Sequence, residues 1–193
     1  WRGAMPTPAA ANVAVLLPSA DAAPCIDRVQ HSPRQPRSGE QVVVRARVRD
    51  AQGVTRVDVL YQIVPAGAYI RLRDAAYNNP RNWVAVAMND EGKDGDEKAG
   101  DGVYAARLPA SLQKHRQLVR YRIKATDRTG NSVQVPYSDD PEPNFAYYCF
   151  DRPAAYLDKY SFEALAPLPV CHLLAKQEDV NYNINQYRGD SYK

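Results

Sequence analysis

The chain has 193 residues, with 25 lysines and arginines against 22 aspartates and glutamates, which gives a net charge of +3 and a pI near 8.7. This length suits one domain with extensions, and so small a basic excess does not by itself indicate a nucleic-acid partner. The apolar runs are much shorter than the ~20 residues of a membrane-spanning helix. Fifteen prolines and thirteen tyrosines against two methionines favour strands and loops over helices. We therefore predict an all-β fold.

The first segment, residues 1–24, is rich in alanine and proline and is predicted to be a linker. It lacks the basic, apolar and cleavage-site series of a signal peptide, and we expect the chain to be cut from a longer protein. From residue 25 a strand-sized segment runs to a proline-rich turn at residues 33–39. The predicted β-sandwich module begins with this segment and covers residues 25–137.

Clear period-two alternation predicts the main strands of the module. Residues 41–50 and residues 54–63 each place apolar side chains on one face and polar ones on the other, and residues 118–127 repeat the pattern. The side chains predicted to face inward are Val42, Val44, Ala46, Val48, Val57, Val59, Tyr61, Ile63, Val119, Tyr121, Ile123 and Ala125. Those predicted to face outward into solvent include Arg45, Arg47, Arg49, Arg56, Asp58, Gln62, Arg120, Arg122 and Lys124.

Shorter strands are predicted at residues 83–88, 102–109 and 132–137, and residues 65–82 form a long insertion between two strands. Strands at this spacing, without alternating helices, predict an antiparallel β-sandwich of the immunoglobulin or fibronectin type III kind. Tyr121 stands where such sandwiches place a tyrosine corner. Residues 138–193 are predicted to form an extended strap over the sandwich, then the truncated start of a following domain with a mobile polar end.

An acidic, glycine-rich loop occupies residues 88–104, which read MNDEGKDGDEKAGDGVY. Six acidic residues less two lysines leave a charge of −4, and four glycines allow positive backbone φ angles. With Asp90 aligned to the first position of an EF-hand-type loop, Gly95 falls at the sharp turn and Asp101 at the last ligand position. The match is partial, because Gly92 stands where a side-chain ligand is expected and no helical pattern flanks the loop.

Two interpretations of this loop remain open. In the first, it binds one Ca²⁺ through carboxylates and a backbone carbonyl near Lys98, because calcium prefers six to eight oxygen ligands. In the second, it is a solvated charged hairpin loop without a cofactor. The candidate metal-site residues are Asp90, Asp94, Asp96, Lys98 and Asp101.

The two basic strand faces also have two interpretations. Rows of cations on predicted strands could contact a polyanion such as an acidic polysaccharide, or could be solvated faces that prevent sheet stacking. Aromatic residues do not alternate with these cations, which disfavours nucleic acid. The candidate contact residues are Arg45, Arg47, Arg49, Arg120, Arg122 and Lys124.

No motif in the sequence indicates catalysis by this chain. It contains no phosphate-binding G-x-x-x-x-G-K-[ST], no G-x-S-x-G elbow, no H-E-x-x-H and no dinucleotide fingerprint. Its three histidines lie in separate polar or turn contexts and are interpreted as structural or solvent-facing. Cys25, Cys149 and Cys171 lack the spacing of a zinc site, and one disulfide in any of three pairings remains open.

Several stretches together resemble a known family: GEQVVVRARVRDAQGV, the acidic loop ending in AGDGVY, LVRYRIKATDRTGNSV and PYSDDPEPNFAYYCFD. Over residues 39–151 the sequence resembles the immunoglobulin-like module that precedes the kinase-like domain in large secreted bacterial proteins of the CotH kinase type. PLPVCHLL at residues 167–174 is similar to the opening strand of that kinase-like domain. The resemblance implies an extracellular or cell-surface location and a following domain.

The sequence thus predicts a non-catalytic extracellular β-sandwich that acts as a spacer or interaction module of a larger bacterial surface or secreted protein. Expected partners are other domains of the same polypeptide and cell-surface polysaccharide or protein, without nucleic acid or a membrane span. Two alternatives remain. The chain could be the N-terminal part of a CotH-type kinase-like enzyme whose active site lies beyond it, or a carbohydrate-binding module.

Overall fold

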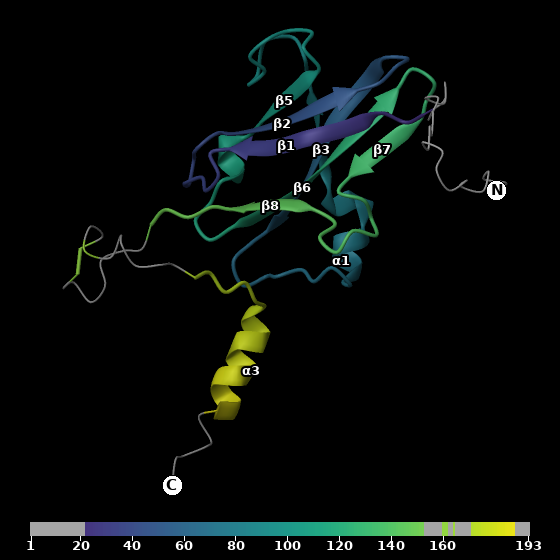
Figure 1. Ribbon diagram of the computed structural model, residues 1–193. Coiled ribbons are helices and arrows are strands. Elements are labelled where there is room, and N and C mark those ends of the chain that lie inside the picture. The colour runs from purple at the N-terminus through teal and green to yellow at the C-terminus, as the bar shows by residue number, and fades with distance from the viewer. Residues whose placement is uncertain (1–21, 153–159, 162–163, 165–170, 188–193) are drawn as a thin grey trace, which may run out of the picture.

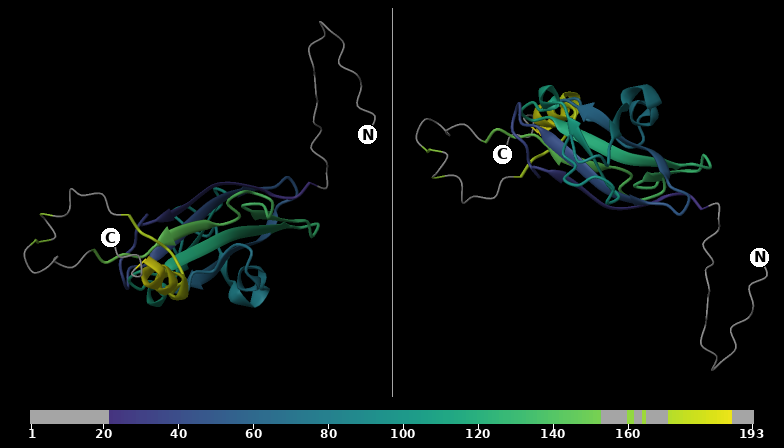
Figure 2. Two further views of the ribbon diagram at one scale, coloured as in Figure 1. Left: turned by 90° about the horizontal axis from the view of Figure 1, so that it is seen from below. Right: turned by 90° about the horizontal axis from the view of Figure 1, so that it is seen from above.

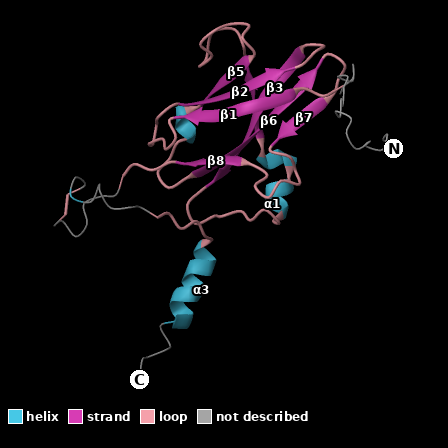
Figure 3. Ribbon diagram, in the orientation of Figure 1, coloured by secondary structure: helices cyan, strands magenta, loops and turns pink. Residues whose placement is uncertain are grey.

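The computed structural model describes residues 22–152, 160, 161, 164 and 171–187, so most of the predicted linker lies outside the described residues. Two antiparallel sheets pack face to face (Figures 1 and 3). The first has three strands in the order β1 (Cys25–Ser32), β2 (Val42–Arg49) and β5 (Val103–Leu108). The prediction of an all-β antiparallel sandwich is confirmed.

The second sheet is built around its longest strands, β3 (Val54–Val64) and β6 (Leu118–Asp127). β4 (Val84–Met88) pairs with the outer edge of β3. The opposite edge of β6 is shared by two short strands, since β8 (Phe145–Tyr148) pairs with its first half and β7 (Ser132–Val135) with its second half. The predicted strap over the sandwich is therefore partly a strand of this sheet.

The core lies between the two sheets and has the predicted register. The inward residues of β2, β3 and β6 are buried, and Ile63 is partly buried beside them. Burying one such side chain stabilises the fold by about 1.5–3 kcal/mol. A shift of one residue would instead bring the arginines of β2 and β6 into the core, so the alternation alone fixes the register.

The outer face of the five-stranded sheet differs from the prediction. Asp58, Gln62 and Arg120, which were expected to face solvent, are only 7%, 1% and 3% exposed. The insertion, which extends over residues 65–83 in the structure, contacts Gln62 and Arg120 and includes α1 (Ala75–Asn78) and the short 3₁₀ helix η1 (Pro80–Asn82), whereas Asp58 pairs with Arg56. Figure 2 shows α1 on the side of this sheet that faces away from β1.

Stacked guanidinium groups and aromatic rings hold the insertion on this face. The Arg120 guanidinium carbon lies 5.1 Å from the Tyr69 ring centre and 5.4 Å from that of Tyr77. Arg122 is next, 4.8 Å from the Tyr77 ring and 4.0 Å from the Trp83 ring. The prediction that Arg120 and Arg122 face water was wrong, because the insertion supplies the rings that cover them. We call these five side chains the cation–π stack.

Tyr121 also differs from its predicted role. Its hydroxyl lies 2.9 Å from Nδ1 of His31 on β1, and its ring packs edge-on against the His31 ring. The tyrosine therefore links the two sheets through a side chain rather than forming a tyrosine corner with nearby backbone. Burial lowers the pKa of His31, which keeps the imidazole neutral beside the core.

The end of the chain contains a helix that the sequence analysis missed. The expected mobile polar end includes α3 (Gln177–Tyr187), whose first turn carries Glu178 and Asp179. Acidic side chains at this position interact favourably with the helix dipole. Residues 171–175 form no strand, and residues 167–170 of the expected opening strand lie outside the described residues.

All three cysteines are free thiols in the structure, so none of the three candidate disulfides is formed. Cys149 is buried, whereas Cys25 and Cys171 are exposed. Within the described ranges, no helix is long and apolar enough to cross a membrane.

Candidate functional site

The acidic loop connects β4 in one sheet to β5 in the other. Hydrogen bonds between its aspartate side chains and its own backbone amides order it. The Asp90 carboxylate accepts hydrogen bonds from the amides of Gly100, Asp101 and Gly102 at 2.8, 3.2 and 3.0 Å. These bonds close the far end of the loop onto its start. The loop is therefore ordered by a carboxylate that binds backbone amides.

A second carboxylate, that of Asp96, lies inside the loop with only 7% of the residue exposed. It accepts hydrogen bonds from the amides of Gly92 at 2.6 Å and Lys98 at 3.4 Å. Buried carboxylates require such partners, because desolvation disfavours their charged form. The sequence identified Asp96 as acidic but gave no sign that it is buried.

Three of the four predicted metal-binding aspartates converge. Carboxylate oxygens of Asp90, Asp96 and Asp101 all lie within 4.8 Å of one another. Asp94 is not part of this group and has a left-handed backbone with φ of 53°. The predicted role of Asp94 as a ligand is therefore not supported by its position, while the other three form a compact oxygen cluster.

The cluster fits a hard cation such as calcium. A carboxylate oxygen that accepts one amide hydrogen keeps a further lone pair, so the bonds to backbone amides do not exhaust its capacity. Three carboxylates supply at most six oxygens, and backbone carbonyls or water can complete the six to eight that calcium takes. The cluster contains no nitrogen or sulfur ligand that would favour zinc.

The loop is fixed to the outer face of β2 by charge and by close packing. Arg45 donates from Nε to the Gly95 carbonyl at 2.8 Å and pairs with Glu97 at 3.0 Å. Gly95 lies so close to Val43 that an added Cβ would clash with Val43 Cγ1. The loop is therefore held on β2 at Gly95 and Glu97, while most of its other residues are exposed.

The other arginines of β2 are also paired within the chain. Arg47 binds both carboxylate oxygens of Asp27 on β1, at 2.6 and 2.7 Å, and Arg49 binds the same carboxylate at 2.8 Å. The hydrogen bond from Arg47 lowers the pKa of Asp27. Two of the three β2 candidates for polyanion contact thus share one internal counter-ion.

The remaining candidates lie on β6 in the other sheet. Arg120 is buried in the cation–π stack, and Arg122 donates from Nε to the Pro143 carbonyl at 3.0 Å. Lys124 is exposed, and its side chain has no hydrogen bond, ion pair or ring contact among the described residues. The arginines that were predicted to contact a polyanion therefore interact mainly with other groups of the module.

One cluster resembles a catalytic triad in composition but differs in geometry. The Asp151 carboxylate accepts from the Ser38 amide and hydroxyl, both at 2.5 Å, and the Asp151 amide donates to Nδ1 of His115 at 3.1 Å. In a serine hydrolase the histidine lies between the serine and the acid, whereas here the acid contacts the serine directly. The bonds from Ser38 lower the pKa of Asp151. The cluster clamps the turn at residues 37–40 to the segment after β8.

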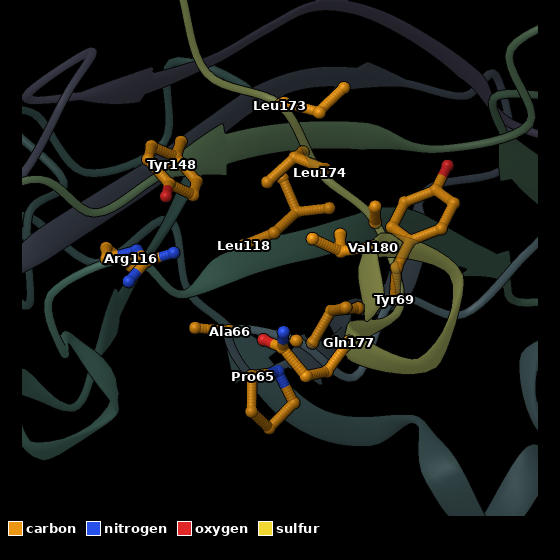
Figure 4. Close-up of a pocket in the computed structure, with 13 residues that line it drawn as sticks. Pro65, Ala66, Tyr69, Arg116, Leu118, Tyr148, Leu173, Leu174, Gln177 and Val180 are labelled. Carbon is orange, nitrogen blue, oxygen red and sulfur yellow. The ribbon is translucent and has the colours of Figure 1, made fainter. Parts of the chain in front are cut away.

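A cavity of about 270 Å³ lies between the sandwich and the C-terminal segment (Figure 4). Its apolar wall includes Leu118 from β6, Leu174 and Val180, and its polar groups include Arg116 and Tyr148. These residues are far apart in sequence and match no motif. Only the docking of the C-terminal segment brings them together.

Comparison with known proteins gives no match to any protein-family model and none to a curated protein. The resemblance to modules of CotH-type proteins therefore stays a prediction.

Replacing Gly95 by alanine tests whether the acidic loop is packed on β2. Gly95 has φ of 99° and contacts Val43, whereas Gly100 has φ of 74° and no atom within 4 Å of an added Cβ. Both substitutions strain the backbone, but only Gly95→Ala adds a clash, so it should cost about 1–3 kcal/mol more in free energy of unfolding. Chemical denaturation measures the difference. Equal costs would show that the loop does not pack against β2.

Proposed function

We propose that this chain is a non-catalytic β-sandwich module that anchors and orients a C-terminal segment of its own polypeptide. The observation that carries the proposal is the docking of α3 by its first turn. The Gln177 amide donates to the Gly67 carbonyl at 2.8 Å, Lys176 forms a β-bridge with Ala68, and Asp179 pairs with Arg71 at 2.8 Å. All these contacts fall on the start of the 65–83 insertion.

The rest of α3 extends away from the sandwich (Figure 1). Tyr182 and Ile184 are 63% and 48% exposed. A helix that is held at one end and projects at the other suits a module that sets the direction of a neighbouring domain. We infer a bacterial surface or secreted setting from the resemblance to CotH-type modules, which is its only support.

The double variant Arg71→Gln/Gln177→Pro tests this anchoring. It removes the ion pair and the amide donor, while proline remains compatible with the first position of a helix. We expect the amides of α3 to exchange with solvent several-fold faster and their NMR order parameters to fall, with the sandwich unchanged. Arg73→Gln, at an exposed arginine with no partner among the described residues, is the matched control. Unchanged order in α3 of the double variant would contradict anchoring through these contacts.

A second proposal is that the acidic loop binds one calcium ion and thereby stiffens the module. The supporting observation is the convergence of Asp90, Asp96 and Asp101, whose oxygens lie within 4.8 Å. The ion would also offset part of the loop's negative charge, which Arg45 neutralises only locally through Glu97. Calcium sites in extracellular modules have dissociation constants of about 10⁻⁴–10⁻³ M, and we expect an affinity in this range.

Thermal unfolding with calcium or with chelator tests the calcium proposal. At ~100 times its dissociation constant, calcium should stabilise the parent chain by about 2.7 kcal/mol if the unfolded chain does not bind it. Asp101→Asn should weaken this response because it removes one converging carboxylate. Asp94→Asn removes the same charge outside the cluster and should leave the response intact. If calcium leaves the melting temperature of the parent chain unchanged, the loop is not a calcium site.

A further inference from the structure

The cavity beneath the C-terminal segment has a polar end and an apolar interior. Figure 4 shows Arg116 and Tyr148 side by side at one end, with Leu118, Leu174 and Val180 facing one another in the middle. Its volume of about 270 Å³ is just below the ~300–1,000 Å³ typical of drug-sized ligands. The cavity therefore suits a small molecule with an apolar body and one polar group.

The polar groups at this end have unused hydrogen-bonding capacity. The Arg116 side chain and the Tyr148 hydroxyl make no hydrogen bond or ion pair with any described residue. Among the described residues, the cavity lining contains no aspartate or glutamate, so no carboxylate of this lining pairs with the guanidinium of Arg116, which is an exposed residue open to solvent. An anion entering this end would therefore meet two donors and no repelling carboxylate from the described part of the lining.

The backbone of Arg116 is held in an uncommon conformation. Its φ is 64°, in the left-handed region that non-glycine residues rarely adopt, and its amide donates to the Cys149 carbonyl at 2.8 Å. This bond ties the turn before β6 to the segment after β8. The side chains of Arg116 and Tyr148 are thus carried by backbone segments that are joined to each other.

We propose that this cavity binds an unbranched aliphatic carboxylate. The carboxylate would accept two hydrogen bonds from the planar guanidinium of Arg116 and one from the Tyr148 hydroxyl, a geometry that a guanidinium matches well. The tail would lie along Leu118, Leu174 and Val180 and remove their apolar surface from water. The apolar side chains in the middle favour an alkyl tail over a sugar, and a guanidinium that pairs with no carboxylate among the described residues favours an acid over an alcohol.

Binding at this place would also reinforce the docking of α3. Leu118, Tyr148 and Arg116 belong to the sandwich, whereas Leu174 and Val180 belong to the C-terminal segment. A ligand between them contacts both parts and would bind the docked form in preference to the undocked one. This inference rests on the proposed anchoring function, because an undocked segment would leave the cavity without one wall.

The test is a titration of the full chain with octanoate, followed by NMR of the leucine and valine methyl groups. Shifts should concentrate at Leu118, Leu174 and Val180, and octan-1-ol should bind at least about tenfold more weakly because it lacks the charge. Arg116→Gln should weaken octanoate binding at least about tenfold. Tyr148→Phe, which keeps the ring, should weaken it several-fold.

Arg81→Gln is the matched control, at an exposed arginine outside the cavity lining, and should bind octanoate like the parent chain. Absence of shifts at these methyl groups, equal binding of octanol, or full binding by Arg116→Gln would each overturn the proposal. Hydrogen exchange of α3 without ligand separates the two ideas. If α3 is ordered but octanoate does not bind, only the ligand proposal fails; if α3 is undocked in the parent chain, the anchoring function fails as well.

Discussion

The cation–π stack on the outer face of the five-stranded sheet holds the insertion, and the C-terminal segment docks on that insertion. Arg120 is buried and pairs with no carboxylate among the described residues, and its hydrogen bond to the Gln62 side chain is long, at 3.5 Å. A buried charge is costly unless its surroundings compensate it, and here aromatic faces contribute about 0.5–2 kcal/mol each. Without Tyr69, Tyr77 and Trp83 over them, these guanidiniums would face water.

The position of the insertion has consequences further along the chain. Its first residues, Gly67, Ala68 and Arg71, form the docking site for α3. Tyr77 donates from its hydroxyl to the Asn144 side chain at 2.9 Å, which joins the insertion to the segment before β8. The stack therefore links the sheet, the insertion, β8 and the C-terminal segment into one arrangement. Both the anchoring function and the cavity beneath the C-terminal segment depend on it.

Ion pairs on the three-stranded sheet also fix neighbouring segments in place. Asp27 neutralises Arg47 and Arg49, and Arg45 holds the acidic loop against β2. These pairs are partly exposed, so each contributes little to stability by itself. Their effect is to fix positions: the loop that brings Asp90, Asp96 and Asp101 together is placed by Arg45 and by the close contact of Gly95 with Val43.

The strands other than β8, the register of the main strands and the acidic loop between β4 and β5 could be predicted from sequence, because period-two alternation directly reports one buried face. The burial of Gln62 and Arg120 beneath the insertion could not be predicted. Their polarity indicates solvent unless a distant segment covers them, and the insertion at residues 65–83 carries no periodic signal. The sequence also identified four candidate aspartates, of which the structure brings Asp90, Asp96 and Asp101 together and leaves Asp94 outside the group, because spacing does not show which way a loop residue turns. The cavity had no sequence signal, since its walls come from four separate segments.

The most direct test of this account is amide hydrogen exchange of residues 65–83 in Arg122→Met, compared with Lys124→Met. Arg122 stacks on two rings, whereas Lys124 is two residues along the same strand face and touches none among the described residues. The account predicts that Arg122→Met speeds exchange in the insertion and the first turn of α3 by roughly 5–30-fold, the effect of losing one to two kcal/mol. Lys124→Met should change neither. Equal protection of the insertion in both variants would contradict the claim that the stack holds it in place.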